Sequence, residues 1–359
     1  MSGKLSEQEV IEVLSQVKDP ETHLSIVKMN MIKDVKVDNG KVDLTVVLTT
    51  PACPLKGEIK SRVEKALYGL PGVQQVEIKM DANVPTQKRP LVENLLPDVR
   101  NSIAVASGKG GVGKSTVAVN MAVALARTGA NVGLLDADCY GPSIPLMMGV
   151  NERPRSAPGT KKILPLESYG VKLMSLGFFL DDNAPVIWRG PMVTSAIQQM
   201  LGEVEWGDLD YLLVDLPPGT GDIHLTLTQK VPLSGAVVVS TPQDVALIDA
   251  RKGLAMFQKV NVPVLGIIEN MSYFVCPHCK ERTNIFSHGG VRKACEELGV
   301  PFLGEIPLDP NICSGGDEGK PIVIADPDSP QSKAFMEVVG TLAASISVRS
   351  FLPELRIIN

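Results

Sequence analysis

One short run constrains this chain more than any other, and it reads Ser107-Gly108-Lys109-Gly110-Gly111-Val112-Gly113-Lys114-Ser115-Thr116. An apolar run precedes it and a small-residue helical pattern follows it, which is the strand, loop and helix order that the pattern G-x-x-x-x-G-K-[ST] requires. Glycines let successive backbone N–H groups turn toward one centre, and the helix N-terminus adds partial positive charge there. We therefore expect this loop to cradle the phosphates of ATP, with Lys114 at the β- and γ-phosphates and the Ser115 hydroxyl on Mg²⁺. The alternative is a glycine-rich turn that binds nothing.

Short apolar runs alternate with helical patterns around and after this loop. The candidate strands are 102–106, 132–136, 211–215, 236–240, 264–270 and 302–306. Continuous apolar runs are typical of strands that are buried on both faces of a parallel sheet. We therefore expect an α/β fold of the P-loop NTPase type, with a mostly parallel sheet flanked by helices. In such sheets ligands bind beyond the carboxyl ends of the strands.

The first part of the chain has a different pattern and predicts a small α/β domain. A helical pattern starts at Ser6, the dipeptide Asn39-Gly40 between alternating runs indicates a hairpin, and a second helix and a last strand follow. A stretch with Pro85, Pro90 and Pro97 then reads as a semi-extended linker. We expect a small domain over 1–85, a linker over 86–100, an ATPase domain over 101–345 and a short tail over 346–359.

Composition excludes several classes of function. The chain has 359 residues, 44% hydrophobic and 21% charged, with a net charge of −5. This balance gives no electrostatic reason to expect nucleic acid or an anionic membrane as partner. No apolar run reaches the ~20 residues that span a bilayer, and the first residues lack the apolar core of a signal peptide. A cytoplasmic location is the default expectation.

Lys109 lies inside the loop, where the general pattern requires no lysine. With it, the sequence resembles the deviant P-loop ATPases, the class that holds MinD, ParA and the nitrogenase iron protein. The resemblance implies that Lys109 reaches the nucleotide of a partner subunit, so that ATP is bound across a homodimer. A solvated loop lysine is the alternative.

Polar side chains end three further candidate strands. By the same resemblance, Asp138 orients or activates the attacking water, Asp136 supports Mg²⁺ or its waters, and Asp215 holds the Mg²⁺ shell as in a Walker B strand. Asp136 could instead cap the next turn. In the class, the amide at the position of Asn270 hydrogen-bonds the adenine edge, for which it offers both a donor and an acceptor.

A metal-binding pattern, Cys276-Pro277-His278-Cys279, follows the strand that ends near Asn270. One C-x-x-C pair supplies two ligands, whereas tetrahedral zinc or a cubane cluster requires four. The chain has no second such pair, but a two-fold dimer would double this one and place the metal on its axis. Zinc with His278 or His288 completing the site, and a redox dithiol, remain alternatives.

The first domain also carries a resemblance. Asp19-Pro20-Glu21, Ser25-Ile26-Val27 and Thr49-Thr50-Pro51-Ala52-Cys53-Pro54 resemble the small domain that often precedes Mrp-type ATPases and also occurs alone in iron–sulfur assembly factors. That resemblance makes Cys53 a candidate cluster or transfer ligand. A half-buried thiol held between two prolines is the other interpretation.

The motifs in their order look like the Mrp (ApbC-type) iron–sulfur cluster carrier ATPases. They are the loop with Lys109, Asp136-Ala137-Asp138 followed by Gly141-Pro142-Ser143, the run 214–222, and Asn270-Met271-Ser272 ahead of Cys276 and Cys279. The family implies a [4Fe–4S] cluster held between the subunits of a homodimer by Cys276 and Cys279, then passed to apo-proteins, with a cluster-assembly scaffold as a further partner.

Two rival interpretations belong to other classes. A partition-type ATPase would act on a membrane or DNA, and a zinc-stabilised nucleotide-binding scaffold would transfer no cluster. The C-x-x-C pair and the first domain argue against the partition-type ATPase. Metal analysis separates the scaffold from a cluster carrier.

Overall fold

The computed structural model describes residues 5–86, 95–160, 162–179, 190–219, 226, 228 and 230–351. Its contacts divide the chain into two compact units, Met1–Thr86 with Ala343–Asn359, and Gln87–Leu342. Most of the expected linker, residues 87–94, and most of the expected tail, residues 352–359, lie outside the described residues. The domain boundaries from the sequence therefore stay predictions, and each unit is described by itself.

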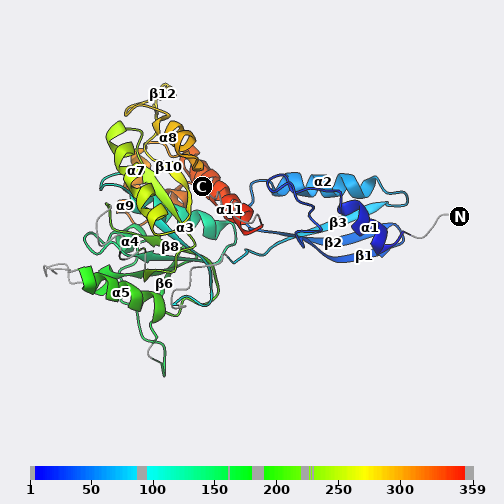
Figure 1. Ribbon diagram of the computed structural model, residues 1–359, viewed down its shortest axis with the longest axis horizontal. Helices are drawn as coiled ribbons and strands as arrows, with labels where there is room; N and C mark the ends of the chain where they lie inside the picture. Colours follow the sequence, from blue (N-terminus) through cyan, green and yellow to red (C-terminus); the bar gives the residue numbers. More distant parts are fainter. Residues whose placement is uncertain are drawn as a thin grey trace. The chain divides into compact units, whose positions relative to one another are not determined.

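The first unit is a three-stranded sheet with two helices (Figure 1). Its elements are α1 (Glu7–Leu14), β1 (Ile32–Asp38), β2 (Lys41–Leu48), α2 (Lys56–Tyr68) and β3 (Gln75–Ala82). The strands lie in the order β1-β2-β3, with β1 antiparallel and β3 parallel to β2. Ser6 and Glu9 form a reciprocal capping box that starts α1, and Asn39 and Gly40 both have positive φ, as a tight hairpin turn requires.

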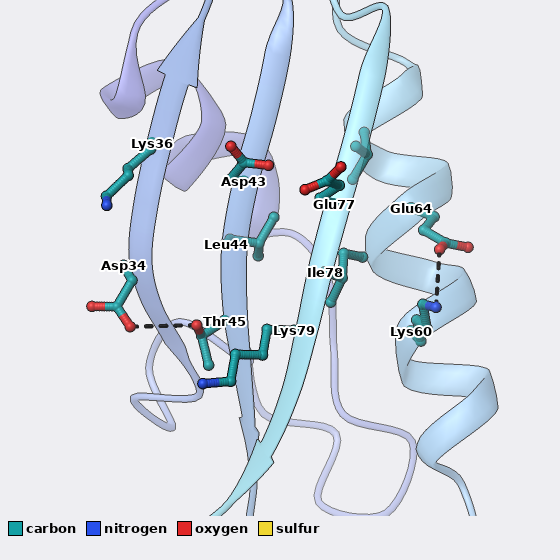
Figure 2. A pocket seen from close by; sticks show the side chains of 11 residues that line it. Asp34, Lys36, Asp43, Leu44, Thr45, Lys60, Glu64, Glu77, Ile78 and Lys79 are labelled. Carbon is teal, nitrogen blue, oxygen red and sulfur yellow. Dashed lines mark hydrogen bonds and ion pairs between the residues drawn. The ribbon is translucent and has the colours of Figure 1, made fainter.

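One face of this sheet packs on the helices and the other is polar. Val10 and Leu14 of α1 and Ile59 of α2 share a core with alternate residues of β2. Figure 2 shows residues that line a hollow of this unit: Asp34 of β1 lies against Thr45 of β2, and Lys60 lies against Glu64 on α2. The volume of this hollow is about 590 Å³. No residue of the phosphate loop or the cysteine motif lines this hollow.

The second unit is built on an eight-stranded sheet in the order β13-β10-β9-β4-β8-β5-β7-β6, within the residues described. Its strands are β4 (Val99–Ala106), β5 (Val132–Asp136), β6 (Leu166–Ser168), β7 (Val171–Ser175), β8 (Leu209–Asp215), β9 (Gly235–Ser240), β10 (Val264–Glu269) and β13 (Phe302–Glu305). All neighbours are parallel except β6 and β7. This confirms the expected α/β class with a mostly parallel sheet.

Helices cover both faces of this sheet, because successive side chains of a strand point to opposite sides. The helices are α3 (Lys114–Arg127), α4 (Ile144–Met147), α5 (Gly190–Gly202), α7 (Asp244–Lys259), α8 (Gly290–Leu298), α9 (Pro310–Asp317), α10 (Ile322–Ala325) and α11 (Pro330–Phe351), with a 3₁₀ turn at Leu176–Phe179. Helices α5, α7 and α8 share one core with Ala104, Leu135 and Ala236, whereas α3 packs with α9 and α10 and contributes nothing to that core.

Three differences from the sequence expectation concern the edges of the fold. The strands β6 and β7 were not expected, because β6 has three residues and β7 mixes apolar and polar residues in a short run. Helix α11 runs through the expected start of the tail at 346. By length and composition α11 could cross a membrane, and its residues Phe335, Val338 and Leu342 are buried inside the structure.

Candidate functional site

The phosphate loop joins the end of β4 to the start of α3, as the sequence predicted. Two of its glycines are required by close approaches. A Cβ at Gly108 would lie 2.3 Å from the Asp249 carbonyl carbon of α7, and a Cβ at Gly113, where φ is 78°, would lie 2.3 Å from the Asn270 amide nitrogen. The loop therefore packs closely between α7 and the end of β10. The N–H groups at the N-terminus of α3 point into the loop.

Three polar side chains meet at the bottom of the loop. The Lys114 ammonium donates to Asp215 Oδ1 at 2.7 Å and to Ser115 Oγ at 3.1 Å, and the Ser115 hydroxyl donates to Asp215 Oδ2 at 2.6 Å. The Lys114 side chain is 6% exposed and the Asp215 side chain is fully buried. These residues come from the start of α3 and the end of β8, so neighbouring parallel strands bring them together.

Two more carboxylates adjoin this group. Asp138 Oδ2 lies 3.6 Å from Lys114 Nζ, and Asp136 pairs across the sheet with Asp215. Burial, and next the charge of Asp215, raise the pKa of Asp136 to about 7. Burial also raises the pKa of Asp215, and the Lys114 charge opposes that shift. One ammonium faces three carboxylates, so this buried edge of the sheet favours additional positive charge.

Asp136 organises the loop that follows β5. Its Oδ1 accepts the Asp138 N–H at 3.1 Å, and its Oδ2 accepts the Ile144 N–H at 3.3 Å and the Ser175 hydroxyl at 2.9 Å. This is the turn-capping arrangement that the sequence left open as an alternative to a metal role. Ser175 ends β7, and its contribution was missed because that strand was missed.

Lys109 lies half-buried at the entry of the loop. The Ser107 hydroxyl donates to its carbonyl oxygen at 2.9 Å, which shapes the loop locally. Its ammonium makes no hydrogen bond or ion pair with any residue that the structure describes.

Asn270 makes a contact that the sequence did not predict. It is 6% exposed, and its amide nitrogen donates to the Val112 carbonyl of the phosphate loop at 2.8 Å. Its backbone N–H bonds to Ser240 at the end of β9. The side chain thus latches the phosphate loop to β10, and one N–H and the carbonyl oxygen of the amide remain for another partner.

The cysteine motif forms the turn of a small hairpin between β11 (Phe274–Val275) and β12 (Arg282–Thr283). The Lys280 N–H bonds to the Cys276 carbonyl at 2.9 Å, and the Cys276 N–H bonds to the Glu281 carbonyl at 3.0 Å. Hydrogen bonds from the backbone N–H groups of Cys279 and His278 to the sulfur lower the pKa of Cys276. Amides that point at a sulfur favour its thiolate form, which is the form that binds metal.

The histidines near this turn do not complete a site with the two sulfurs. Among the described residues, the group of His, Cys, Asp and Glu with ligand atoms within 4.8 Å of one another is Glu269, His288 and Glu305, without either cysteine. Cys276 is half-buried and Cys279 is exposed. Among the described residues, these two sulfurs have no further ligand-type side chain grouped with them.

Cys53 lies in the first unit in a different environment. It is half-buried, and burial raises the pKa of its thiol to about 11. Asp19, from the neighbouring motif, accepts the backbone N–H groups of Glu21 and Thr22 and the Thr22 hydroxyl, which closes a turn. The Asp19-Pro20-Glu21 motif thus has a structural role, and the role of Cys53 stays a prediction.

Comparison with known proteins adds to this geometry. Residues 98–343 match the ParA-group family described as NUBPL iron-transfer P-loop NTPase, and residues 7–80 match the family described as iron–sulfur cluster assembly protein. An iron–sulfur cluster carrier protein of Synechocystis sp. is 51% identical, over 97% of this chain and 100% of its own length. One of Deinococcus radiodurans is 49% identical, over 96% and 97%. A mitochondrial iron–sulfur protein required for NADH dehydrogenase, from Arabidopsis thaliana, is 54% identical over 68% of this chain and 78% of its own.

Solved structures agree on the second unit. A nucleotide-binding protein of Archaeoglobus fulgidus in complex with ADP superposes with a TM-score of 0.60 and 39% identity, over 68% of this chain and 95% of that one. The cell division ATPase MinD of Pyrococcus furiosus superposes with a TM-score of 0.52 and 24% identity, over 67% and 98%. The MinD likeness concerns the fold alone.

Proposed function

The chain belongs to the ParA-group family of NUBPL iron-transfer P-loop NTPases, and on that premise we propose that it carries a [4Fe–4S] cluster across a homodimer and delivers it to apo-proteins in an ATP-dependent cycle. The relatives at about half identity over the full chain are named iron–sulfur cluster carriers, which supports the cargo. The cluster type and the dimer are proposed from the cysteine hairpin and Lys109, and the ATP dependence from the phosphate loop.

One observation carries the proposal: the surface hairpin offers two cysteine sulfurs and, among the described residues, no third ligand. Four thiolates bind a cubane cluster, so one chain supplies half of the set. A second copy related by a two-fold axis would supply Cys276 and Cys279 again, with the cluster on the axis. The lowered pKa of Cys276 agrees with a thiolate ligand.

The nucleotide site supports a hydrolase that works by positioning and charge neutralisation. We assign Gly108 to Thr116 to the phosphates, with Lys114 on the β- and γ-phosphates. Asp138, whose carboxylate lies 3.6 Å from the Lys114 ammonium, would orient the attacking water. Asn270 would read the adenine edge with the amide atoms that its contact to Val112 leaves over.

The donor set also fits Mg²⁺, which prefers oxygen ligands. The Ser115 hydroxyl and the Asp215 carboxylate are adjacent and Asp136 faces Asp215, so hard oxygen donors surround a place with excess negative charge. These residues would hold the ion directly or through water, and the ion would neutralise phosphate charge. Lys114 would then exchange part of its contact with Asp215 for the phosphate oxygens.

Dimerisation accounts for two incomplete features at once. The Lys109 ammonium has no partner among the described residues, and we assign it to the nucleotide of the other subunit. The cysteine pair is half of a cluster site. We expect a cytoplasmic protein whose partners are a cluster-assembly scaffold and apo iron–sulfur proteins, with neither nucleic acid nor membrane as a target.

Anaerobic reconstitution with iron and sulfide tests the proposal. We expect about four irons per dimer and a broad absorption band from thiolate-to-iron charge transfer. Cys276→Ala and Cys279→Ala should each lose the cluster and retain ATP binding. Cys313→Ala is the matched control, because Cys313 is also exposed but lies on α9, outside the hairpin.

Two outcomes would contradict this function. Tightly bound zinc without iron in anaerobically purified protein would leave a nucleotide-binding scaffold. A full cluster in Cys276→Ala would mean that other residues hold it.

A further inference from the structure

The hairpin that carries the cysteine pair has few contacts of its own. Its strands β11 and β12 have two residues each, and residues 277–285 are exposed. A two-stranded hairpin is marginal in water unless it packs on another element. A site that must meet a second copy in a defined geometry therefore needs an attachment outside the hairpin.

Arg282, on β12, is the side chain that makes this attachment. Its guanidinium lies over the Tyr273 ring at 3.7 Å from the ring centroid, and it donates to Glu305 Oε2 at 3.0 Å. The same guanidinium lies 3.2 Å from His288 Nδ1. One planar cation thus stacks on the stem of the hairpin and joins β12 to two other segments, through an ion pair with Glu305 and a polar contact with His288.

The partners of Arg282 are themselves fixed to the sheet. Glu305 ends β13, and the backbone of the stem is hydrogen-bonded alongside it, with Ser272 N–H on the Ile306 carbonyl at 2.9 Å and Leu308 N–H on the Tyr273 carbonyl at 2.7 Å. These backbone bonds stop at Tyr273. Beyond that residue, the ion pair of Arg282 with Glu305 connects β12 of the hairpin to β13 of the sheet.

A buried carboxylate, that of Glu269, lies next to His288 in the same group of side chains. Glu269, fully buried at the end of β10, accepts the Ser272 hydroxyl at 2.5 Å and the Val291 N–H at 3.0 Å. It therefore fixes both the stem of the hairpin and the start of α8, just after His288. A carboxylate that accepts two such bonds in a buried site is held in one orientation.

The next residue of the chain connects this cluster to the nucleotide site. Asn270 directly follows Glu269, and its amide nitrogen donates to the Val112 carbonyl of the phosphate loop at 2.8 Å. The segment from 269 to 276 therefore contacts the phosphate loop at one end and carries the first cysteine at the other. The hairpin follows β10 in the chain, so its position relative to β10 is fixed only where contacts attach it to the sheet.

We infer that Arg282 is a positioning residue for the cysteine pair: through Tyr273 and Glu305 it holds the hairpin on the sheet, so that the sulfurs keep a fixed geometry relative to the phosphate loop. This inference rests on the proposed cluster-carrier function and extends it. Single contacts of this kind at the surface are weak, but the hairpin has few others to replace them.

A divalent metal at Glu269, His288 and Glu305 is the competing use of these side chains. Their ligand atoms lie within 4.8 Å of one another. However, Arg282 and Arg292 both contact Glu305, at 3.0 and 3.6 Å, and Arg282 also contacts His288. The guanidinium groups already occupy the place where a cation would bind. We therefore assign Glu269, His288 and Glu305 to holding the hairpin and α8 in place.

A matched pair of full-length variants tests the anchor. Arg282→Gln removes it, and Arg292→Gln removes the same charge from the same carboxylate but on α8, where Arg292 stacks on Phe302 instead of on the hairpin stem. After anaerobic reconstitution we expect Arg282→Gln to lose its cluster to a chelator about 10-fold faster than Arg292→Gln, the low end for residues that orient metal ligands. The visible circular dichroism of the cluster should change in Arg282→Gln alone, and Arg282→Lys, which keeps the ion pair, should restore it in part.

A second readout needs no cluster. Hydrogen exchange of the amides of Cys276 and Lys280 should accelerate about 10-fold in Arg282→Gln, with β4 and β8 unchanged. Equal exchange and equal cluster loss in the two variants would overturn the anchor. If wild-type protein takes up no iron, the proposed function fails, while the exchange experiment still decides whether Arg282 holds the hairpin.

Discussion

The phosphate loop and the cysteine hairpin are both candidate binding sites in one unit of the chain, and they are built in opposite ways. Around the loop, Lys114, Asp136, Asp138 and Asp215 are nearly buried, and their hydrogen bonds come from several strand ends. The hairpin presents Cys279 at the surface, and its Arg282 contacts Tyr273 and Glu305.

This difference fits what each site has to do. Phosphoryl transfer requires groups that are held in place before the nucleotide arrives, in a site that excludes water. A cluster that is passed on must be reachable by a second protein, so its ligands lie at the surface. Loss of one buried charged contact at the loop should therefore reduce hydrolysis more than loss of one surface contact at the hairpin reduces retention of the cluster.

The largest effect is expected for Lys114→Ala. The change leaves Asp215 buried without its cationic partner and removes the cation from the phosphates, so we expect hydrolysis to fall by about 10²–10³-fold, as when one preorganised donor is lost. Breaking a buried pair in this way also costs about 3–5 kcal/mol of unfolding free energy. Steady-state hydrolysis and thermal unfolding measure the two effects.

Lys109→Ala is the comparison for that prediction. Its ammonium has no described partner, so stability should not change, whereas hydrolysis should be lost if it acts on the other subunit's nucleotide. Both variants should keep a reconstituted cluster. Loss of the cluster in Lys114→Ala would show that the two sites are not built independently.

Cys53 provides a cysteine environment that contrasts with that of the hairpin. Cys53 has a pKa of about 11, because burial disfavours its thiolate. At pH 8, two units of pKa reduce the thiolate fraction about 100-fold relative to an unshifted thiol, and the reactive form increases about tenfold per pH unit until pH 11. Alkylation followed by peptide mass spectrometry should therefore label Cys276 long before Cys53. Equal labelling of Cys53 and Cys276 at pH 8 would contradict the expectation that Cys276 forms a thiolate more readily than Cys53.

Asn270 is where the two regions touch, and Asn270→Ala measures that link. Its amide makes one hydrogen bond to Val112 and is proposed to make another to adenine, each with about 1 kcal/mol of net value, so ATP affinity should fall by up to about 30-fold. Preference for ATP over GTP should decrease at the same time. If ATP and GTP were weakened equally, the residue would be a latch of the loop without a role in reading the base.

The sequence predicted most of the buried region for a physical reason. Strands buried on both faces are continuous apolar runs, and polar residues that end such runs gather at one edge of a parallel sheet. Asp136, Asp215 and Asn270 could be placed in this way. The contacts between distant segments could not be predicted, because no local pattern indicates that Arg282 contacts Glu305 or that Asn270 contacts Val112.

The smallest predicted effect falls on a residue that the sequence did not indicate at all. Ser175, at the end of the unexpected strand β7, donates to Asp136 at 2.9 Å and accepts the Gly177 N–H at 2.9 Å. Ser175→Ala should cost about 1 kcal/mol of unfolding free energy and slow hydrolysis by about 5-fold, because Asp136 loses one of the three bonds that orient it. Ser168→Ala is the control, since Ser168 lies in the adjacent strand β6 and donates to the Met148 carbonyl at 2.8 Å instead. If both variants hydrolysed ATP equally, Asp136 would be held by its backbone contacts alone, and β7 would serve only to close the edge of the sheet.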